Sequence, residues 1–255
     1  MKKLAILFLL VFICQGVILS QTESQTETES KITVKDMPYK NVVKLNTLSL
    51  VFKNVSLFYE RAITPRISAS MGFGYKFANP EPRILKGDNE QIVLNPKGIE
   101  GHTITPEVRY YIKKCDQTIM DGFYVGLYFR YTHYKSGTHF DYYPANGNNQ
   151  TFDGNIKLDE YGVGFQLGYQ LVIYKRLMVD FMFLGPRYSR YKLQYGFDEN
   201  VSQAFLDDLS NYMNDIIDKF GYDYKVNLET KGSRSAKGKF GFVNLRVGIS
   251  LCFAF

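Results

Sequence analysis

The chain has 255 residues, a formal net charge of +6 at pH 7, 20 Phe, 20 Tyr and no Trp. Its basic and acidic residues are interspersed, so no stripe of Lys and Arg points to a nucleic-acid partner. Although 45% of the residues are hydrophobic, mean hydropathy is only −0.21, which is typical of strands in which apolar and polar residues alternate.

The N-terminus has the pattern of a secretory signal peptide. A basic start at Lys2 and Lys3 precedes the unbroken apolar run Leu4–Cys14, and Ser20 is a small residue at a suitable cleavage position. The run is too short to cross a bilayer as a helix, which needs about 20 apolar residues. We therefore predict a signal peptide at residues 1–20. The cysteine that ends the run leaves a lipoprotein interpretation open, although the residues before it are not the small ones that lipidation requires.

Residues 21–39 are polar and repetitive, with Gln, Thr, Glu and Ser predominating. Such a composition buries too little apolar surface to fold alone. We predict a flexible lead ahead of the folded domain.

From residue 41 onward, apolar residues recur at every second position, which predicts strands with one apolar and one polar face. The third strand is the clearest, with Ile67, Met71 and Phe73 on one face and small or polar residues on the other. The first strand changes phase near Asn46, which predicts a β-bulge there. We predict eight strands, at about Asn41–Phe52, Val55–Ala62, Arg66–Phe77, Thr103–Ile112, Phe123–Tyr134, Glu160–Val172, Leu177–Tyr195 and Lys239–Phe255.

The last of these strands ends the chain on an exposed aromatic residue. After a secretory signal, such a strand is typical of the closing strand of an outer-membrane β-barrel. Phe253 and Phe255 are then the C-terminal signal that the outer-membrane assembly machinery reads.

The connections between the predicted strands differ in length. Those after the second, fourth and sixth strands are short, whereas Ala78–Gly101, Lys135–Lys157 and Gly196–Gly238 are long. Outer-membrane barrels have short periplasmic turns and long external loops. The sequence therefore predicts an all-β fold, an eight-stranded antiparallel transmembrane β-barrel at residues 40–255. The polar lead at 21–39 lies on its periplasmic side, and outer-membrane lipid surrounds it.

The inward parity of these strands carries charges of both signs. An eight-stranded barrel is just wide enough for its own side chains, and isolated charges there are costly. We predict a packed polar network that closes the lumen; the alternative is a path for protons or solutes. The network residues are Glu60, Lys76, Glu107, Arg109, Arg130, Glu160, Asp180 and Arg246.

The longest connection contains a helical pattern at about residues 201–220. Its apolar side chains either pack on the barrel rim and neighbouring loops or bind an unknown protein partner or the outer leaflet. They are Phe205, Leu209, Tyr212, Ile216 and Phe220.

An enzyme that removes acyl chains from lipid A needs a His and a Ser close together. His133 lies three residues before Ser136, but the spacing differs from that of known deacylase barrels and no acidic third member is evident. We predict no catalytic site and keep a lipid A-modifying enzyme as the alternative. The mature histidines His102, His133 and His139 lack metal-ligand spacing, so no metal or cofactor is predicted.

Two segments carry a family resemblance. Ser56-Leu57-Phe58-Tyr59-Glu60-Arg61 and Phe183-Leu184-Gly185-Pro186-Arg187-Tyr188 resemble phrases of small outer-membrane β-barrels of unknown function that are common in Bacteroidota, within the OmpA-like barrel superfamily. The likeness covers about residues 40–255. It implies an eight-stranded barrel in the outer membrane and no catalytic residues.

Three functions follow from the sequence. The first is an integral outer-membrane barrel with a closed polar lumen, whose external loops have a structural or surface-interaction role. The second is the lipid A-modifying enzyme. The third is a soluble β-barrel that binds a small apolar ligand.

Overall fold

The computed structural model describes residues 39–78, 91–112, 120–219, 229–230 and 234–255. The predicted signal peptide and residues 21–38 of the predicted lead lie outside these ranges, as does Phe220.

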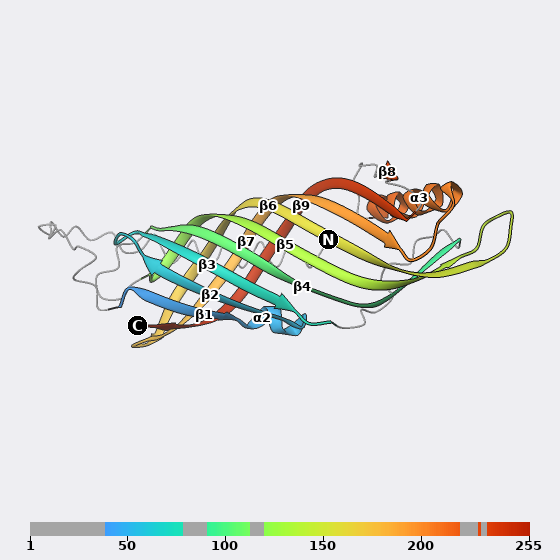
Figure 1. Ribbon diagram of the computed structural model, residues 1–255. Helices are drawn as coiled ribbons and strands as arrows, with labels where there is room; N and C mark the ends of the chain where they lie inside the picture. Colours follow the sequence, from blue (N-terminus) through green and yellow to red (C-terminus); the bar gives the residue numbers. More distant parts are fainter. Residues whose placement is uncertain (1–38, 79–90, 113–119, 220–228, 231–233) are drawn as a thin grey trace, which may run out of the picture. The chain divides into compact units, whose positions relative to one another are not determined.

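Eight antiparallel strands form a closed ring in the described part of the chain (Figure 1). Strand β1 closes the ring against β9 through pairs such as Val43 with Phe253, which leaves no strand edge unpaired at the closure. The two-residue strand β8 (Glu229–Thr230) adds to the far end of β9. The prediction of an all-β fold with eight antiparallel strands is confirmed. The ring strands are β1 (Asn41–Asn46), β2 (Asn54–Ala62), β3 (Ile67–Lys76), β4 (Ile92–Tyr111), β5 (Gly122–Tyr142), β6 (Gln150–Tyr174), β7 (Leu177–Phe197) and β9 (Ser235–Ala254).

The first strand is shorter than predicted. A single strand over Asn41–Phe52 with a bulge is wrong, because β1 ends at Asn46 and the short helix α2 (Thr47–Val51) follows. The Asn46 side chain caps α2 by accepting a hydrogen bond from the Ser49 backbone N–H at 3.0 Å. The phase change in the apolar pattern therefore marks the start of a helix.

Five strands continue beyond the ring. Strand β3 ends at Lys76 opposite Gly101, whereas β4 continues along β5 as far as Ile92. Strand β1 ends opposite Ser250, whereas β9 continues along β7 as far as Ser235. We call the part of the ring below the row of paired residues that begins at Lys76 and runs through Gly101, Tyr134, Leu158, Leu193 and Gly238 the barrel section. The continuation of β4, β5, β6, β7 and β9 is the extension.

The extension corrects one predicted loop and one predicted strand start. The predicted loop Lys135–Lys157 is mostly strand, since β5 runs to Tyr142 and β6 begins at Gln150. Strand β4 begins well before the predicted start at Thr103. Both errors have one cause: the predictions required apolar outward residues, and the outward face of the extension is polar.

The side-chain pattern reverses between the two parts. In the barrel section apolar residues face outward, whereas in the extension they face inward and form a core. On the outer face of the extension, hydrogen bonds with His139 and Lys97 hold the pKa of the Asp153 carboxyl below its usual value. The extension is thus built like a water-soluble sheet. The strand residues of its core are Ile92, Phe140, Tyr142, Phe152, Leu193, Tyr195, Phe197 and Ala236.

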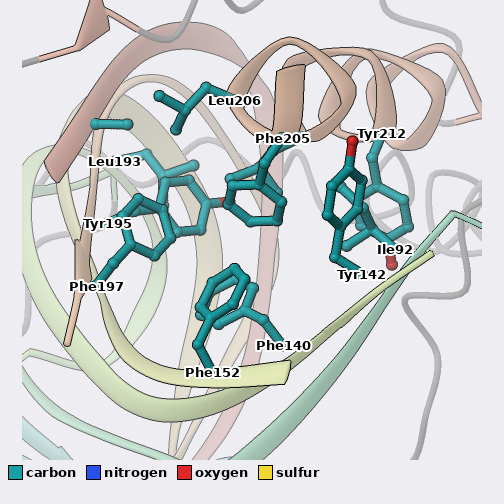
Figure 2. Close-up of a cluster of buried hydrophobic side chains, with 12 residues drawn as sticks. Ile92, Phe140, Tyr142, Phe152, Leu193, Tyr195, Phe197, Phe205, Leu206 and Tyr212 are labelled. Carbon is teal, nitrogen blue, oxygen red and sulfur yellow. The ribbon is translucent and has the colours of Figure 1, made fainter. Parts of the chain in front are cut away.

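Helix α3 (Gln203–Lys219) completes this core. Phe205 is fully buried, and its ring centroid lies 4.8 Å from that of Phe152 and 5.5 Å from that of Phe197 (Figure 2). Leu209 and Tyr212, two further residues of the predicted apolar stripe, belong to the same cluster. The chain itself therefore covers these three side chains, and the position of the Ile216 side chain lies outside the description.

A hydrogen bond also ties α3 to the extension. The Tyr142 hydroxyl donates to Asp208 Oδ2 at 2.7 Å, and burial together with this bond raises the pKa of Tyr142 to about 12. Neither of the described helices, α2 and α3, is long and apolar enough to cross a bilayer.

Replacing Phe205 by Ala should release α3 from the extension. Truncation of a fully buried Phe costs about 3–5 kcal/mol, because the transfer free energy is lost and a cavity remains. We expect chymotrypsin to cleave α3 much faster in the variant while the ring remains intact, as measured by limited proteolysis with mass spectrometry. The matched control is Asn211→Ala, an exposed position on the same helix that should leave the cleavage rate unchanged. Equal rates for Phe205→Ala and wild type would contradict the packing described here.

Candidate functional site

The inward side chains of the barrel section form a charged network. At its centre lie Lys44 on β1, Glu60 on β2 and Asp180 on β7, each at most 3% exposed. Lys44 Nζ donates to Asp180 Oδ2 at 2.7 Å and to Gln170 Oε1 at 2.6 Å, and it forms an ion pair with Glu60. One cation on β1 thus contacts side chains of β2, β6 and β7.

Arg109 on β4 connects this centre to the next layer of the lumen. Its Nη1 donates to Asp180 Oδ2 at 2.6 Å, and its Nη2 donates to Glu107 Oε2 at 2.7 Å. The Tyr124 hydroxyl donates to the other Asp180 oxygen at 2.7 Å, and the Tyr124 ring centroid lies 4.4 Å from the guanidinium carbon of Arg109. These contacts offset the cost of removing the charges from water.

Glu107 also binds Arg246 on β9, whose Nη1 donates to Oε1 at 2.7 Å. The guanidinium carbon of Arg246 lies 5.3 Å from the Phe58 ring centroid and 5.1 Å from that of Tyr128. Arg246 is therefore held by one carboxylate and two aromatic rings.

Glu160 on β6 anchors two further arginines. Arg187 Nη2 lies 2.6 Å from Glu160 Oε1, to which the Ser189 hydroxyl also donates at 2.7 Å. Arg130 is more distant, with its Nε 4.0 Å from Glu160 Oε2 and donating to Thr132 Oγ1 at 3.2 Å. Arg187 and Arg130 both line one cavity, which residues of α2 also line.

The structure brings seven of the eight predicted lumen residues into these contacts. Lys76, the eighth, is half-buried at the end of β3, with its Nζ 6.0 Å from the Tyr134 ring centroid. Two network residues were missed, Lys44 and Arg187. Lys44 was obscured by the phase change at the end of β1, although it alternates with apolar neighbours. Arg187 follows a register shift between Met182 and Gly185 that reverses the parity of β7.

A cavity of about 310 Å³ lies above the network, next to α2. Its lining runs from buried Thr105 to Phe52, which is 68% exposed, so the cavity reaches the surface at this end. Three arginines line it: Arg130, Arg187 and Arg246. We call it the arginine cavity. Among the described residues, no group of His, Cys, Asp and Glu side chains is suited to hold a metal ion.

The His133 pair considered from the sequence does not form. His133 and Ser136 lie on opposite faces of β5, because Ser136 is buried on the inward side. On the outward side, His133 Nδ1 lies 2.7 Å from Asp159 Oδ1, and its ring centroid is 5.5 Å from that of His102. His133 therefore has an acidic neighbour, Asp159, that sequence spacing did not reveal. The other neighbour of its ring is the imidazole of His102 and not a serine.

Of the predicted C-terminal pair, Phe253 lies on the outward face of β9 and Phe255 follows the end of that strand. Phe253 is 46% exposed and Phe255 is 48% exposed. The Phe255 N–H donates to the Asn41 carbonyl at 2.9 Å, so the pair sits at the seam where the ring closes.

Comparison with known families identifies the chain. The family described as "Protein of unknown function (DUF3575)" matches residues 9–213, which include strands β1 to β7 and the first part of α3. The chain belongs to the DUF3575 family. The resemblance to a family of unknown function is confirmed in this respect. The DUF3575 match stops before β9, the strand that closes the ring.

The two remaining comparisons add no relative: the chain matches no curated protein and no solved structure.

Replacing Asp180 by Ala should strongly destabilise the barrel. Lys44 and Arg109 would lose the carboxylate that they share, and an uncompensated buried charge costs about 3–5 kcal/mol. We expect a loss of this size in the free energy of unfolding, measured by urea denaturation. The matched control is Asp198→Ala, at an exposed position, which should change stability by less than about 0.5 kcal/mol. Combining Asp180→Ala with Lys44→Met should recover part of the loss, because one unpaired cation is then removed. Similar stabilities for the two Asp variants would refute the role of the network.

Proposed function

We propose that the chain is an integral outer-membrane β-barrel with a closed polar lumen. Its extension and α3 then stand outside the cell and have a structural or surface-interaction role. The observation that carries the proposal is the outer face of the barrel section, which is apolar around the ring while the charges lie inside. A water-soluble protein has polar residues outside and apolar residues inside, whereas a barrel surrounded by lipid has an apolar outer face and a polar interior.

The apolar face has the dimensions of a lipid-facing band. On β5 it runs from Phe123 to Tyr131, a rise of about 20 Å for strands tilted by about 40°. Outer-membrane barrels carry a band about 25 Å tall. Leu127, at its middle, is 68% exposed. Other exposed members are Leu57, Met71, Phe73, Val108, Phe129, Val163, Phe165, Leu171, Phe183, Val243, Leu245, Val247, Ile249 and Leu251.

The upper limit of the band coincides with the reversal of the side-chain pattern. Outward residues in register across six strands change there from apolar to polar or amphipathic. Aromatic rings of Tyr131 and Tyr161, 5.2 Å apart, lie just below this row, as expected for a girdle at a membrane surface. The row consists of Tyr75, His102, His133, Asp159, Lys192 and Lys239.

The opposite end of the barrel section supports a periplasmic orientation. The described turns there are short, and Phe253 and Phe255 remain exposed at the closing seam. We propose that these two side chains are read by the outer-membrane assembly machinery. Membership of the OmpA-like barrel superfamily found in Bacteroidota is part of the same proposal.

The lumen argues for a closed barrel. Charged side chains from β1, β2, β4 and β7 contact one another across its centre at hydrogen-bond distances, so they fill the space that a solute path would need. A soluble carrier of apolar ligands fits less well, because three arginines and several other polar side chains line the arginine cavity together with its apolar residues. A lipid A-modifying enzyme also fits less well, because the serine that its mechanism requires does not lie beside His133.

Replacing Leu127 by Arg tests the lipid-facing band. A cation at the bilayer midplane costs about 2–4 kcal/mol in a transmembrane barrel. We expect the variant to fold poorly into lipid vesicles, as judged by loss of the folded species that migrates differently on unboiled gels. The wild type should fractionate with the outer membrane. The matched control, Asn155→Arg, lies on the polar outer face of the extension and should fold normally. A Leu127→Arg protein that folds as well as the control would show that water covers this face.

Planar-bilayer recordings test the closed lumen. We expect no steady conductance from purified wild-type protein, because the central ion pairs block the bore. The variant Asp180→Asn is recorded in the same bilayer for comparison. This substitution weakens the ion pairs of Asp180 with Lys44 and Arg109 and keeps the side-chain volume. A stable open pore in the wild type would contradict the closed lumen but not the membrane location.

A further inference from the structure

We propose that the arginine cavity binds a small oxyanion, a phosphate or carboxylate group that enters beside α2. The inference goes beyond the membrane role and does not depend on it.

Charge is unbalanced around this cavity. Arg130, Arg187 and Arg246 line it, and no Asp or Glu is among the described residues of its lining. Their partners Glu160 and Glu107 are not among the lining residues, and Glu107 is shared with Arg109. Three guanidinium groups that line a common space, with their counter-charges outside that lining, favour an anion in that space.

Arg130 has unused bonding capacity at its two terminal nitrogens. Its contacts to Thr132 and Glu160 both involve Nε, and neither terminal nitrogen takes part in them. The Glu160 contact is 4.0 Å long, compared with 2.6 Å for Arg187. A guanidinium whose two terminal nitrogens remain available is suited to bidentate binding of an oxyanion.

The other donors are held in place. The Arg246 guanidinium is fixed between the rings of Phe58 and Tyr128 and by its bond to Glu107. The Ser56 hydroxyl donates to Asn54 Oδ1 at 3.3 Å, which leaves the amide nitrogen of Asn54 as a neutral donor at the mouth. Rigid donors of this kind bind anions without a large ordering cost.

The volume and the rim restrict the ligand. About 310 Å³ corresponds to roughly ten water molecules, enough for a phosphate with part of its hydration shell. Beside the mouth, α2 and the residue after it expose Leu50, Val51 and Phe52, which are 42%, 74% and 68% exposed. The phosphate group that the cavity would bind can belong to a dissolved anion or to a lipid headgroup, since both present the same oxyanion.

The test is calorimetric titration of the purified full chain, in a non-ionic detergent, with inorganic phosphate. We expect one site per chain, and Arg130→Gln should weaken it at least tenfold, since a charged hydrogen-bond donor is lost. Arg130→Gln should fold normally because Arg130 makes no close ion pair, and its urea midpoint verifies this. Asn54→Asp is a second variant at the mouth, and it should weaken binding by charge repulsion without touching the central network.

The matched control is Arg190→Gln, which removes an exposed arginine from the outward face of β7. A parallel arm replaces phosphate by lipid vesicles with and without phosphatidylglycerol. Arg130-dependent binding of phosphate assigns a dissolved anion, whereas Arg130-dependent binding of phosphatidylglycerol alone assigns a lipid headgroup. The proposal fails if neither probe binds, or if Arg190→Gln weakens binding as much as Arg130→Gln does.

Discussion

Closure of the ring between β1 and β9 is the constraint on which the rest of the structure depends. Once no edge remains, every side chain of the barrel section faces either the narrow interior or the surroundings. Lys44, Glu60, Arg109 and Asp180 have to satisfy one another because no water-filled space is left for them. The same closure displays the apolar residues outward, where only a nonpolar solvent suits them.

In the extension, the same strands have the opposite pattern, with polar side chains outward and apolar side chains inward. Aromatic residues of the extension turn inward and are covered by α3, so this part carries its own core. The barrel section and the extension thus form two differently solvated structures on continuous strands. The arginine cavity lies near their junction, beside α2, which follows the early end of β1.

Apolar periodicity in the sequence predicted most of the fold. Alternation at every second residue predicted the eight antiparallel strands, and helical spacing predicted the helix near residues 201–220. Alternation predicts strands only where the outward face is apolar, so it predicts a loop for the extension, whose outward residues, such as Lys157, are polar. For the lumen, parity placed Glu107, Arg109 and Asp180 correctly on the inward face. It missed Lys44 and Arg187 because a helix cap at Asn46 and a register shift in β7 change the count, and neither has a strong local signal. The cavity and the covering of Phe205 depend on contacts between distant segments, which spacing along one strand does not encode.

The register shift in β7 also governs how the chain tolerates insertions and deletions. One extra residue between Met182 and Gly185 sets the phase for everything that follows in the strand. Losing that residue would exchange the two faces of β7 beyond it, moving Arg187 and Tyr191 into the surroundings and Arg190 into the interior. Length variation among related chains is therefore expected to spare this short stretch and to accumulate in the connections, where a change of count turns no side chain around.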